Sequence, residues 1–471
     1  MKRRINISLI ILIFFISAVA FGQNYFNKSI PLADAQAATS IQQLSDGGYL
    51  IAGQNYKSNS QTIFFMRVDI NGDTVWTKEY GNTSTYYWVN YSSLNTTSDG
   101  NYICAVTMQD STSNYDAILL KFTINGDTLW SKKFGGPYFD AGRDCQQTTD
   151  GGYMLVVDSD SLNNGLNDCL LIKTDSIGNI EWKKRYDAGG YDVAVCGLQT
   201  LDGGYIISGA RGSSNWIVKA DSMGQMEWSR TYSTGTNDGL CWISQLSNGE
   251  YISAGAKVVT GMNKQAGIRK LKPDGTINWE KLYGGVGNDA FHFNVIEFSE
   301  SYALVGNYTN PVGKYEGSLL KIDTAGNHIW ERTYTYNYWV HNYVCDVKKT
   351  TDNGFIICGQ TFDISNDVWL LKLDSAGCES ANCNVGINEQ NEANHKFIIY
   401  PNPTDKNLNI SIEGKKVDDY NITITNIIGQ MQEFTITDSI ISLEKFAPGL
   451  YIISATSKKG EHYLSQKFIK Q

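Results

Sequence analysis

Two short stretches of the sequence carry side chains suited to binding a sugar ring or a peptide. They read Tyr86-Tyr87-Trp88-Val89-Asn90-Tyr91 and Tyr336-Asn337-Tyr338-Trp339-Val340-His341-Asn342-Tyr343. Planar aromatic rings bury a large area at a small cost in conformational entropy, and the polar groups beside them can form hydrogen bonds. The candidate ligand-binding residues are therefore Tyr87, Trp88, Tyr91, Tyr338, Trp339, His341 and Tyr343. The alternative is that they are large core residues that fill gaps between neighbouring sheets.

Carboxylates at a recurring position suggest a second kind of chemistry. The recurring residues are Asp34, Asp140, Asp192, Asp238 and Asp289. Such a set could gather a cation, but we favour the interpretation that each Asp accepts backbone N–H bonds within its own repeat. The sequence has no Gly-x-Ser-x-Gly motif, phosphate-binding loop or Cys/His cluster with zinc spacing. We therefore expect no catalytic residue, no metal and no cofactor.

The aromatic stretches belong to a chain of repeats, which must position them. An aromatic residue follows a turn at intervals of about 50 residues, a period near that of β-propeller blades. These residues are Tyr49, Tyr102, Tyr153, Tyr205, Tyr251, Tyr302 and Phe355. A Trp follows a later Gly turn in six repeats, at Trp76, Trp130, Trp182, Trp228, Trp279 and Trp330. Short alternating runs between Gly, Asn and Asp turns predict four antiparallel strands in each repeat.

The seventh repeat lacks the strand that carries the Trp, because it ends near Leu373 and continues to Cys378. The start of the mature chain, Tyr25–Ile30, resembles that missing strand. Pairing the two would close a ring and leave no lateral sheet edge. The sequence therefore predicts an all-β fold: a seven-bladed β-propeller over residues 23–378, closed by the N-terminal strand. In this ring the blades that carry the two aromatic stretches flank the first blade.

The N-terminus and the charge restrict the compartment and the partners. Basic residues followed by an apolar run and a small-residue cleavage site predict a signal peptide over residues 1–22. No segment of the mature chain is expected to span a membrane. The formal net charge of −9 argues against a nucleic-acid partner. Cys378 and Cys383 follow the repeats, and either a local disulfide or two free thiols fits an exported chain.

The composition changes again after the repeats. Residues 379–394 form a polar linker, and residues 395–471 alternate apolar residues with turns, which predicts a small β-sandwich. This segment resembles the type A C-terminal sorting domain of the type IX secretion system. The resemblance rests on Tyr400-Pro401-Asn402-Pro403, the segment 426–429, Pro448-Gly449-Leu450-Tyr451, Lys467 and Lys470. It implies that the type IX machinery is a partner, that the chain crosses the outer membrane, and that the tail is removed on release or surface attachment.

The repeats resemble the delta-60 type of bacterial β-propeller repeat, which implies a fold and no particular activity. We therefore expect a monomeric, non-enzymatic protein that is secreted or attached to the outer-membrane surface. Its propeller loop face would recognise a glycan or a protein. One alternative is an extracellular glycan hydrolase or lyase that uses channel-lining carboxylates. The other is a structural adhesin or spacer.

Overall fold

The structure is a computed structural model, which describes most of the chain that follows the predicted signal peptide. It describes residues 24–471 except 33, 83–84, 111, 113, 161–164, 166, 188, 191, 213, 233–240, 259–263, 285–289, 292–294, 311, 363–365, 381–396, 413–415, 427–431 and 459–462. These residues form an all-β structure with one short 3-10 turn, η1 (Val417–Asp419). The chain divides into two compact units, Met1–Asn382 and Cys383–Gln471, which are described separately.

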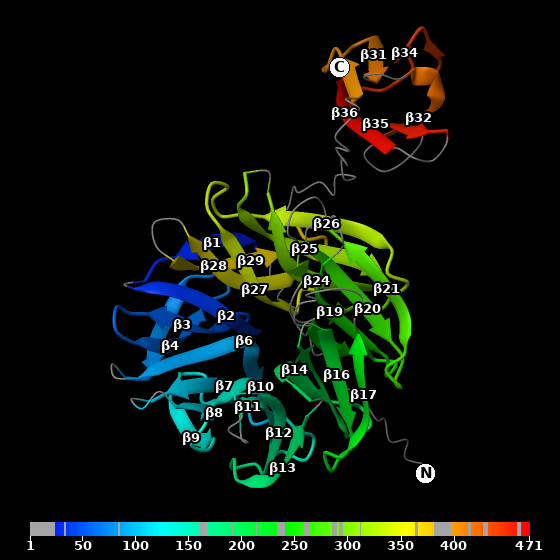
Figure 1. Ribbon diagram of the computed structural model, residues 1–471. Coiled ribbons are helices and arrows are strands. Elements are labelled where there is room, and N and C mark those ends of the chain that lie inside the picture. Colours follow the sequence, from blue (N-terminus) through cyan, green and yellow to red (C-terminus); the bar gives the residue numbers. More distant parts are fainter. Residues whose placement is uncertain are drawn as a thin grey trace, which may run out of the picture. The chain divides into compact units, whose positions relative to one another are not determined.

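The repeats in the described part of the first unit mostly form four-stranded antiparallel sheets that follow one another in chain order (Figure 1). One parallel pair, Gln61 with Tyr86, joins the strands of repeats 1 and 2 into a single sheet. We number the repeats 1 to 7. Repeat 1 contains β2 (Ala35–Gln43), β3 (Tyr49–Tyr56), β4 (Gln61–Val68) and β5 (Thr74–Tyr80). Repeat 2 contains β6 (Tyr86–Thr96), β7 (Tyr102–Gln109), β8 (Tyr115–Phe122) and β9 (Thr128–Phe134). Repeat 3 contains β10 (Asp140–Gln147), β11 (Tyr153–Ser159), β12 (Asp168–Thr174) and β13 (Ile180–Tyr186).

The later repeats continue this pattern. Repeat 4 contains β14 (Asp192–Gln199), β15 (Tyr205–Arg211), β16 (Ser214–Ala220) and β17 (Met226–Tyr232). Repeat 5 contains β18 (Cys241–Gln245), β19 (Tyr251–Val258), β20 (Lys264–Leu271) and β21 (Ile277–Tyr283). Repeat 6 contains β22 (Ala290–Phe291), β23 (Ile296–Glu297), β24 (Ser301–Thr309), β25 (Tyr315–Asp323) and β26 (His328–Tyr334). Repeat 7 contains β27 (Asn342–Lys349), β28 (Phe355–Phe362) and β29 (Asn366–Leu373).

The tight turns explain why the sequence makes hairpins at these places. Between β14 and β15, Gly203 has a φ of +81°, which an L side chain rarely adopts. The carboxylate of Asp202 accepts the N–H of Gly204 at 3.0 Å. A Cβ on Gly204 would lie 2.3 Å from the carbonyl oxygen of Ala220, so the neighbouring strand can approach only a glycine. The Asp-Gly-Gly sequence thus fixes both the turn and the close approach behind it.

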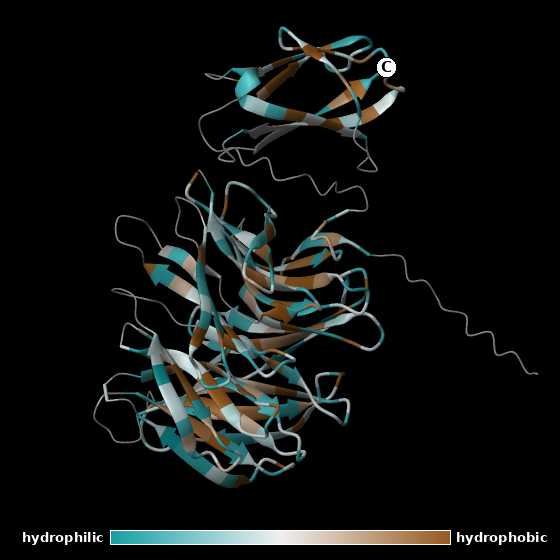
Figure 2. Ribbon diagram, turned by 90° about the vertical axis from the view of Figure 1, so that its right-hand side faces the viewer, coloured by the Kyte–Doolittle hydropathy of each residue, from teal (hydrophilic) through white to brown (hydrophobic). Residues whose placement is uncertain are grey.

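The N-terminal strand β1 (Phe26–Ile30) belongs to the sheet of repeat 7. It pairs antiparallel with β29, from Phe26 opposite Lys372 to Ile30 opposite Val368, in the sheet order β1-β29-β28-β27. One buried apolar cluster then contains residues of repeats 1 and 7 together. Its members include Phe26, Ile41, Phe64, Ile356 and Leu370. Figure 2 shows the hydrophobic residues concentrated on the strands, as expected where sheets cover one another.

An aromatic ring on the fourth strand of each repeat covers a glycine of the next repeat. These glycines have φ between +74° and +81°, and a Cβ on any of them would lie 2.7–3.2 Å from the ring. Six pairs are Trp76 with Gly126, Trp130 with Gly178, Trp182 with Gly224, Trp228 with Gly275, Trp279 with Gly326, and Trp330 with Gly377. Between repeats 7 and 1, Phe26 covers Gly72 in the same way.

A hydrogen bond also recurs between neighbouring repeats. The side chain at the end of a first strand accepts a backbone N–H from the turn of the preceding repeat. Gln147 accepts the N–H of Ser98 at 2.6 Å, and Gln199 accepts that of Thr149 at 2.8 Å. Gln43 of repeat 1 likewise accepts the N–H of Thr351 of repeat 7 at 2.8 Å. The contact between the last and first repeats therefore has the same chemistry as the contacts between consecutive ones.

The second compact unit contains two sheets around one apolar core. The first has the order β30-β31-β34-β33 and the second the order β32-β35-β36. The strands are β30 (Phe397–Tyr400), β31 (Asn407–Ile412), β32 (Tyr420–Asn426), β33 (Ile436–Thr437), β34 (Ile440–Ser442), β35 (Gly449–Ser457) and β36 (Tyr463–Lys470). Leu408 and Ile410 from the first sheet share the core with Ile424, Ile453 and Phe468 from the second.

Candidate functional site

The exposed aromatic side chains described in the first unit gather at one end of the sheets. We call this end, where the first strand of each repeat begins, the aromatic face. It carries Tyr56, Tyr86, Tyr91, Tyr138, Tyr336, Tyr338 and Trp339. Trp339 is 70% exposed, the most of any of them. At the opposite end, the exposed large residues are aliphatic, such as Leu201 and Met223 in the turns of repeat 4.

One group of rings on the aromatic face lies at the junction of repeats 6 and 7. The ring of Tyr315 lies 5.4 Å from that of His341 and 4.9 Å from that of Tyr343, centroid to centroid. Phe362 adds an edge contact to Tyr343 at 5.6 Å. The imidazole Nδ1 of His341 accepts the backbone N–H of Tyr315 at 3.2 Å. Burial and the nearby Lys314 lower the pKa of His341, which favours a neutral ring at pH 7.

A second group occupies the corresponding place at the junction of repeats 2 and 3. Tyr115 begins its strand as Tyr315 does, and its ring lies 4.9 Å from that of Phe139 and 5.2 Å from that of Trp88. Phe139 directly precedes Asp140, just as His341 directly precedes Asn342. The same two positions of the repeat therefore build both ring groups.

Tyr91 connects the repeats between these groups. The nearby Cys345, together with burial, raises the pKa of Tyr91 far above its usual value, and the hydroxyls of Tyr56 and Tyr343 add to the effect. These neighbours come from repeats 7 and 1, so three repeats meet here. The Tyr91 side chain is still 42% exposed. Tyr56 was missed in the sequence, where it is only the last residue of a strand.

The seven residues singled out in the sequence do not all reach this surface. Tyr87 is 7% exposed and packs against Tyr80, with ring centroids 5.8 Å apart. It lies in the core, as the alternative interpretation requires, and we do not retain it as a ligand contact. Trp88, Tyr91, Tyr338, Trp339, His341 and Tyr343 are at least partly exposed. They divide between the two ring groups and the positions next to them, rather than forming a single cluster.

Charged side chains around the aromatic face are largely paired within the protein. Lys57 binds Glu79 at 2.7 Å, and the Arg143 guanidinium donates to Asp158 at 2.5 Å. The buried Asp346 binds Lys348 at 2.8 Å and accepts the N–H of Ile41 at 3.0 Å. These pairs neutralise part of the charge near the aromatic face, and aromatic rings make up much of what it exposes.

Among the recurring carboxylates, that of Asp140 has a clear structural contact. Asp140 accepts the N–H of Gly136 at 2.8 Å, the kind of bond that the sequence suggested. Asp238 and Asp289 lie outside the described residues. The carboxylates of Asp168, Asp187 and Asp192 come together, but Arg185 pairs with the first two at 2.7 and 3.3 Å. The guanidinium already supplies the positive charge that a cation would bring, so we assign no metal here.

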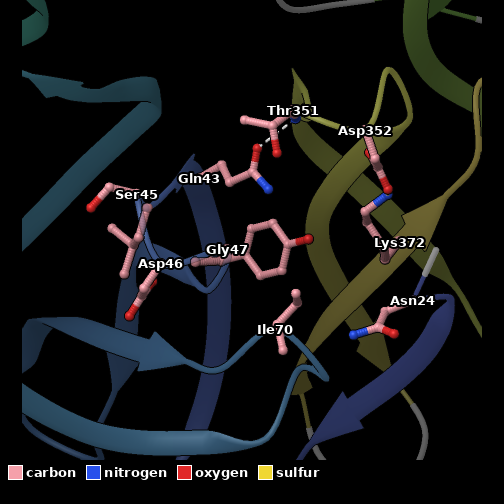
Figure 3. A pocket seen from close by; sticks show the side chains of 11 residues that line it. Asn24, Gln43, Ser45, Asp46, Gly47, Ile70, Thr351, Asp352 and Lys372 are labelled. Carbon is pink, nitrogen blue, oxygen red and sulfur yellow. Dashed lines mark hydrogen bonds and ion pairs between the residues drawn. The ribbon is translucent and has the colours of Figure 1, made fainter. Parts of the chain in front are cut away.

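A pocket of about 170 Å³ lies at the junction of repeats 7 and 1 (Figure 3). Its polar side chains are engaged with protein groups: Gln43 with the N–H of Thr351, and Lys372 with Asp352 at 2.8 Å. In Figure 3 the Lys372 and Asp352 side chains point toward each other across one wall. The pocket is explained by the contact between the repeats, and we assign no ligand to it.

The residues of the predicted sorting motif meet in the second unit. The Asn402 side chain donates to the carbonyl oxygen of Lys467 at 2.8 Å and accepts the N–H of Ile469 at 3.0 Å. Thr404 forms a bridge with Lys470, beyond Pro401 and Pro403. The rings of Tyr451 and Phe468 stack with centroids 5.5 Å apart in the core, and the preceding Gly449 begins β35. Tyr400 is 56% exposed, and its carbonyl accepts the amide of Asn409 at 2.9 Å.

Six cysteine side chains are buried in the described part of the first unit. Cys104, Cys145, Cys169, Cys196, Cys345 and Cys358 are buried as thiols outside any disulfide. Burial raises the pKa of the Cys104 thiol to about 12, which keeps it protonated and unreactive. Cys378 is disulfide-bonded. Cys383 lies outside the described residues, so the predicted pairing of these two cysteines stays a prediction.

Comparison with known proteins identifies the tail. Residues 398–471 match the family described as the secretion system C-terminal sorting domain. This match indicates that the protein is secreted through the type IX system and attached to the cell surface. Among the described residues, no helix combines the length and apolar character needed to cross a membrane. The comparison with curated proteins gives no match.

Solved structures similar to the chain are distant. A Dyadobacter fermentans protein of unknown function has 12% identity and a TM-score of 0.45, covering 62% of this chain and 97% of that one. The Neurospora crassa Pan2 WD40 domain has 10% identity and a TM-score of 0.43, covering 71% and 88%. PorZ, a surface component of the Porphyromonas gingivalis type IX secretion system, has 10% identity and a TM-score of 0.26, covering 92% and 81%.

Proposed function

We propose that this exported protein binds an extracellular glycan or protein through the aromatic face of a seven-bladed β-propeller. In this proposal β1 closes the propeller, residues 1–22 are a signal peptide, Cys378 pairs with Cys383, and the mature protein is a monomer. The observation that carries the binding role is the gathering of the described exposed aromatic side chains at one end of the sheets. Tyr and Trp side chains are enriched at binding interfaces, because they bury a large apolar area and keep a polar group for a hydrogen bond.

The contacts between repeats 7 and 1 support the closed ring. Phe26 covers Gly72 as each Trp covers the glycine of the following repeat, and Gln43 accepts the N–H of Thr351. Asp346 of repeat 7 also accepts the Ser92 hydroxyl of repeat 2, at 2.6 Å. A ring joined by equivalent contacts would hold its loops at fixed positions, which suits recognition better than an open array.

The test is binding by the purified full chain, on a glycan array and to proteins captured from the culture medium. Trp339→Ala removes the most exposed ring of the aromatic face, and Tyr56→Ala removes the ring between the two groups. Leu201→Ala is the matched control, because Leu201 is 73% exposed at the opposite end of the sheets. We expect binding to weaken at least tenfold in both aromatic variants and to be unchanged in the control.

Thermal melting of each variant separates loss of binding from loss of fold. Exposed side chains contribute little to stability, so the melting temperatures should agree with that of the wild type. Wild-type binding by both aromatic variants would refute the proposed site. An equal loss in the control would show that the binding does not depend on the aromatic face.

A further inference from the structure

A pocket of about 420 Å³ opens at the junction of repeats 2 and 3, beside Tyr138 of the aromatic face. Its walls include the apolar side chains of Phe134, Val157, Leu170 and Ile172. This volume falls within the range of small-ligand sites, which are mostly apolar and carry a few placed polar groups. The pocket adjoins the second ring group, because Tyr138 precedes Phe139 in the chain.

Two buried carboxylates stand at one end of this pocket. Asp140 lines it and is 5% exposed, while Asp116 is fully buried beside it. A Cβ on Gly135, which also lines the pocket, would lie 2.4 Å from Asp116 Oδ1 and 3.2 Å from Asp140 Oδ2. Only a glycine can therefore lie this close to both carboxylates. Within the described residues, Asp116 Oδ1 accepts no hydrogen bond, although a buried acceptor normally has a donor.

The charges around the pocket favour an uncharged ligand with hydroxyl groups. Lys133 pairs with Asp116 through Oδ2 at 2.6 Å. Arg185, on another wall, pairs with Asp168 and Asp187. Two of the three basic groups at the pocket are therefore already paired, and the third, Lys183, lies near Asp140 and offsets part of its charge. The Asp140 carboxylate then favours a ligand that donates hydrogen bonds. An anionic ligand would instead be repelled by the carboxylate of Asp140, which lines the pocket.

We propose that this pocket binds one ring of a neutral sugar. The sugar hydroxyls would donate to Asp140, which lines the pocket, and the apolar face of the ring would lie against Tyr138. Further rings of an oligosaccharide would continue over Phe139, Tyr115 and Trp88. The proposal rests on the function proposed above and narrows its ligand to a glycan.

The test uses the purified full chain on an array of neutral oligosaccharides and uronic-acid oligosaccharides, followed by calorimetric titration of the best neutral one. Asp140→Asn should weaken binding at least tenfold, because an uncharged amide oxygen is a weaker acceptor than a carboxylate and the amide nitrogen cannot accept at all. The chain itself supports this variant, since Asn342 holds the corresponding position of repeat 7 and accepts the N–H of Tyr336 at 3.2 Å. Tyr138→Ala should weaken binding to a similar extent.

Asp192→Asn, at the same position of the next repeat, is the matched control and should bind as the wild type does. If Trp339→Ala abolishes glycan binding while Asp140→Asn and Tyr138→Ala do not, the pocket is excluded and the aromatic face stands. Binding to uronic-acid oligosaccharides and to no neutral oligosaccharide would refute the proposal that the ligand is a neutral sugar. If the chain binds no glycan but binds a captured protein, and that binding is lost in Trp339→Ala, the sugar pocket is refuted and the proposed binding function is kept.

Discussion

Replacing Gly72 by alanine measures whether the first strand of the chain is docked on repeat 1 in solution. Gly72 has a φ of +80°, and a Cβ there would lie 3.0 Å from the ring of Phe26. An L residue in this conformation costs about 1–2 kcal/mol. Forcing an extra carbon into a filled site costs about 1–3 kcal/mol more. The free energy of unfolding should therefore fall by about 2–5 kcal/mol, summing these two terms.

Two further glycines supply the controls. Gly224 lies at an interior junction with a φ of +74° and a Cβ position 2.7 Å from Trp182. Gly203 has a φ of +81° but no atom within 4 Å of its Cβ position, so its alanine variant pays only the conformational cost. In thermal and urea unfolding followed by circular dichroism, Gly72→Ala should match Gly224→Ala, and both should be less stable than Gly203→Ala.

A loss in Gly72→Ala no larger than that in Gly203→Ala would refute the docking of Phe26 on Gly72, provided that Gly224→Ala shows the larger loss. The double variant Phe26→Ala/Gly72→Ala adds an independent measurement. If the two residues touch, the Gly72 substitution should cost less when the ring is already absent.

Three further predictions follow from buried or bonded polar groups. Burial raises the pKa of Asp144 to about 7. The folded state therefore keeps a proton on this carboxyl that the unfolded state releases near pH 4. Because of this difference, the free energy of unfolding should fall as the pH rises from about 4 to 7. Melting temperatures from pH 5 to 7.5 should therefore fall more steeply for the wild type than for Asp144→Asn, and equal slopes would contradict the assignment. Asp346→Ala leaves the ammonium of Lys348 and the backbone N–H of Ile41 without their acceptor. Urea unfolding should therefore show that the free energy of unfolding falls by about 3–5 kcal/mol, and a fall of less than about 1 kcal/mol would contradict this role. Asn402→Ala removes the acceptor of the Ile469 N–H. Hydrogen exchange of that amide should become about tenfold faster, which corresponds to about 1.4 kcal/mol. An unchanged exchange rate would contradict this hydrogen bond.

Local sequence signals were sufficient for the strands and the tail. The alternation of apolar residues between turns predicted short antiparallel strands in each repeat, and Tyr205, the aromatic residue that follows the turn in repeat 4, begins β15. Turns of this kind depend on neighbouring residues alone, so no knowledge of the rest of the fold is required. The tail motif was equally local, and residues 398–471 match the sorting-domain family.

The candidate site was only partly predictable, because its groups form between repeats. Nothing near Tyr315 in the sequence indicates that it contacts His341 of the following repeat. The space beside Gly135 likewise depends on two carboxylates from different repeats. Tyr87 was the exception, since it shares one side of its strand with the buried Val89 at a spacing of two residues. That spacing already favoured a core position.

The pairing of β1 with β29 has a consequence for the order of folding. Phe26 leaves the ribosome long before Lys372, its partner across the sheet. Each interior repeat can complete its own hairpins as it is made, whereas the first strand must wait for the last repeat. Contacts this distant in sequence form slowly, because a long loop must close first. Until then β29 presents an unpaired edge, so aggregation and misassembly should be most frequent in the interval just before that strand docks.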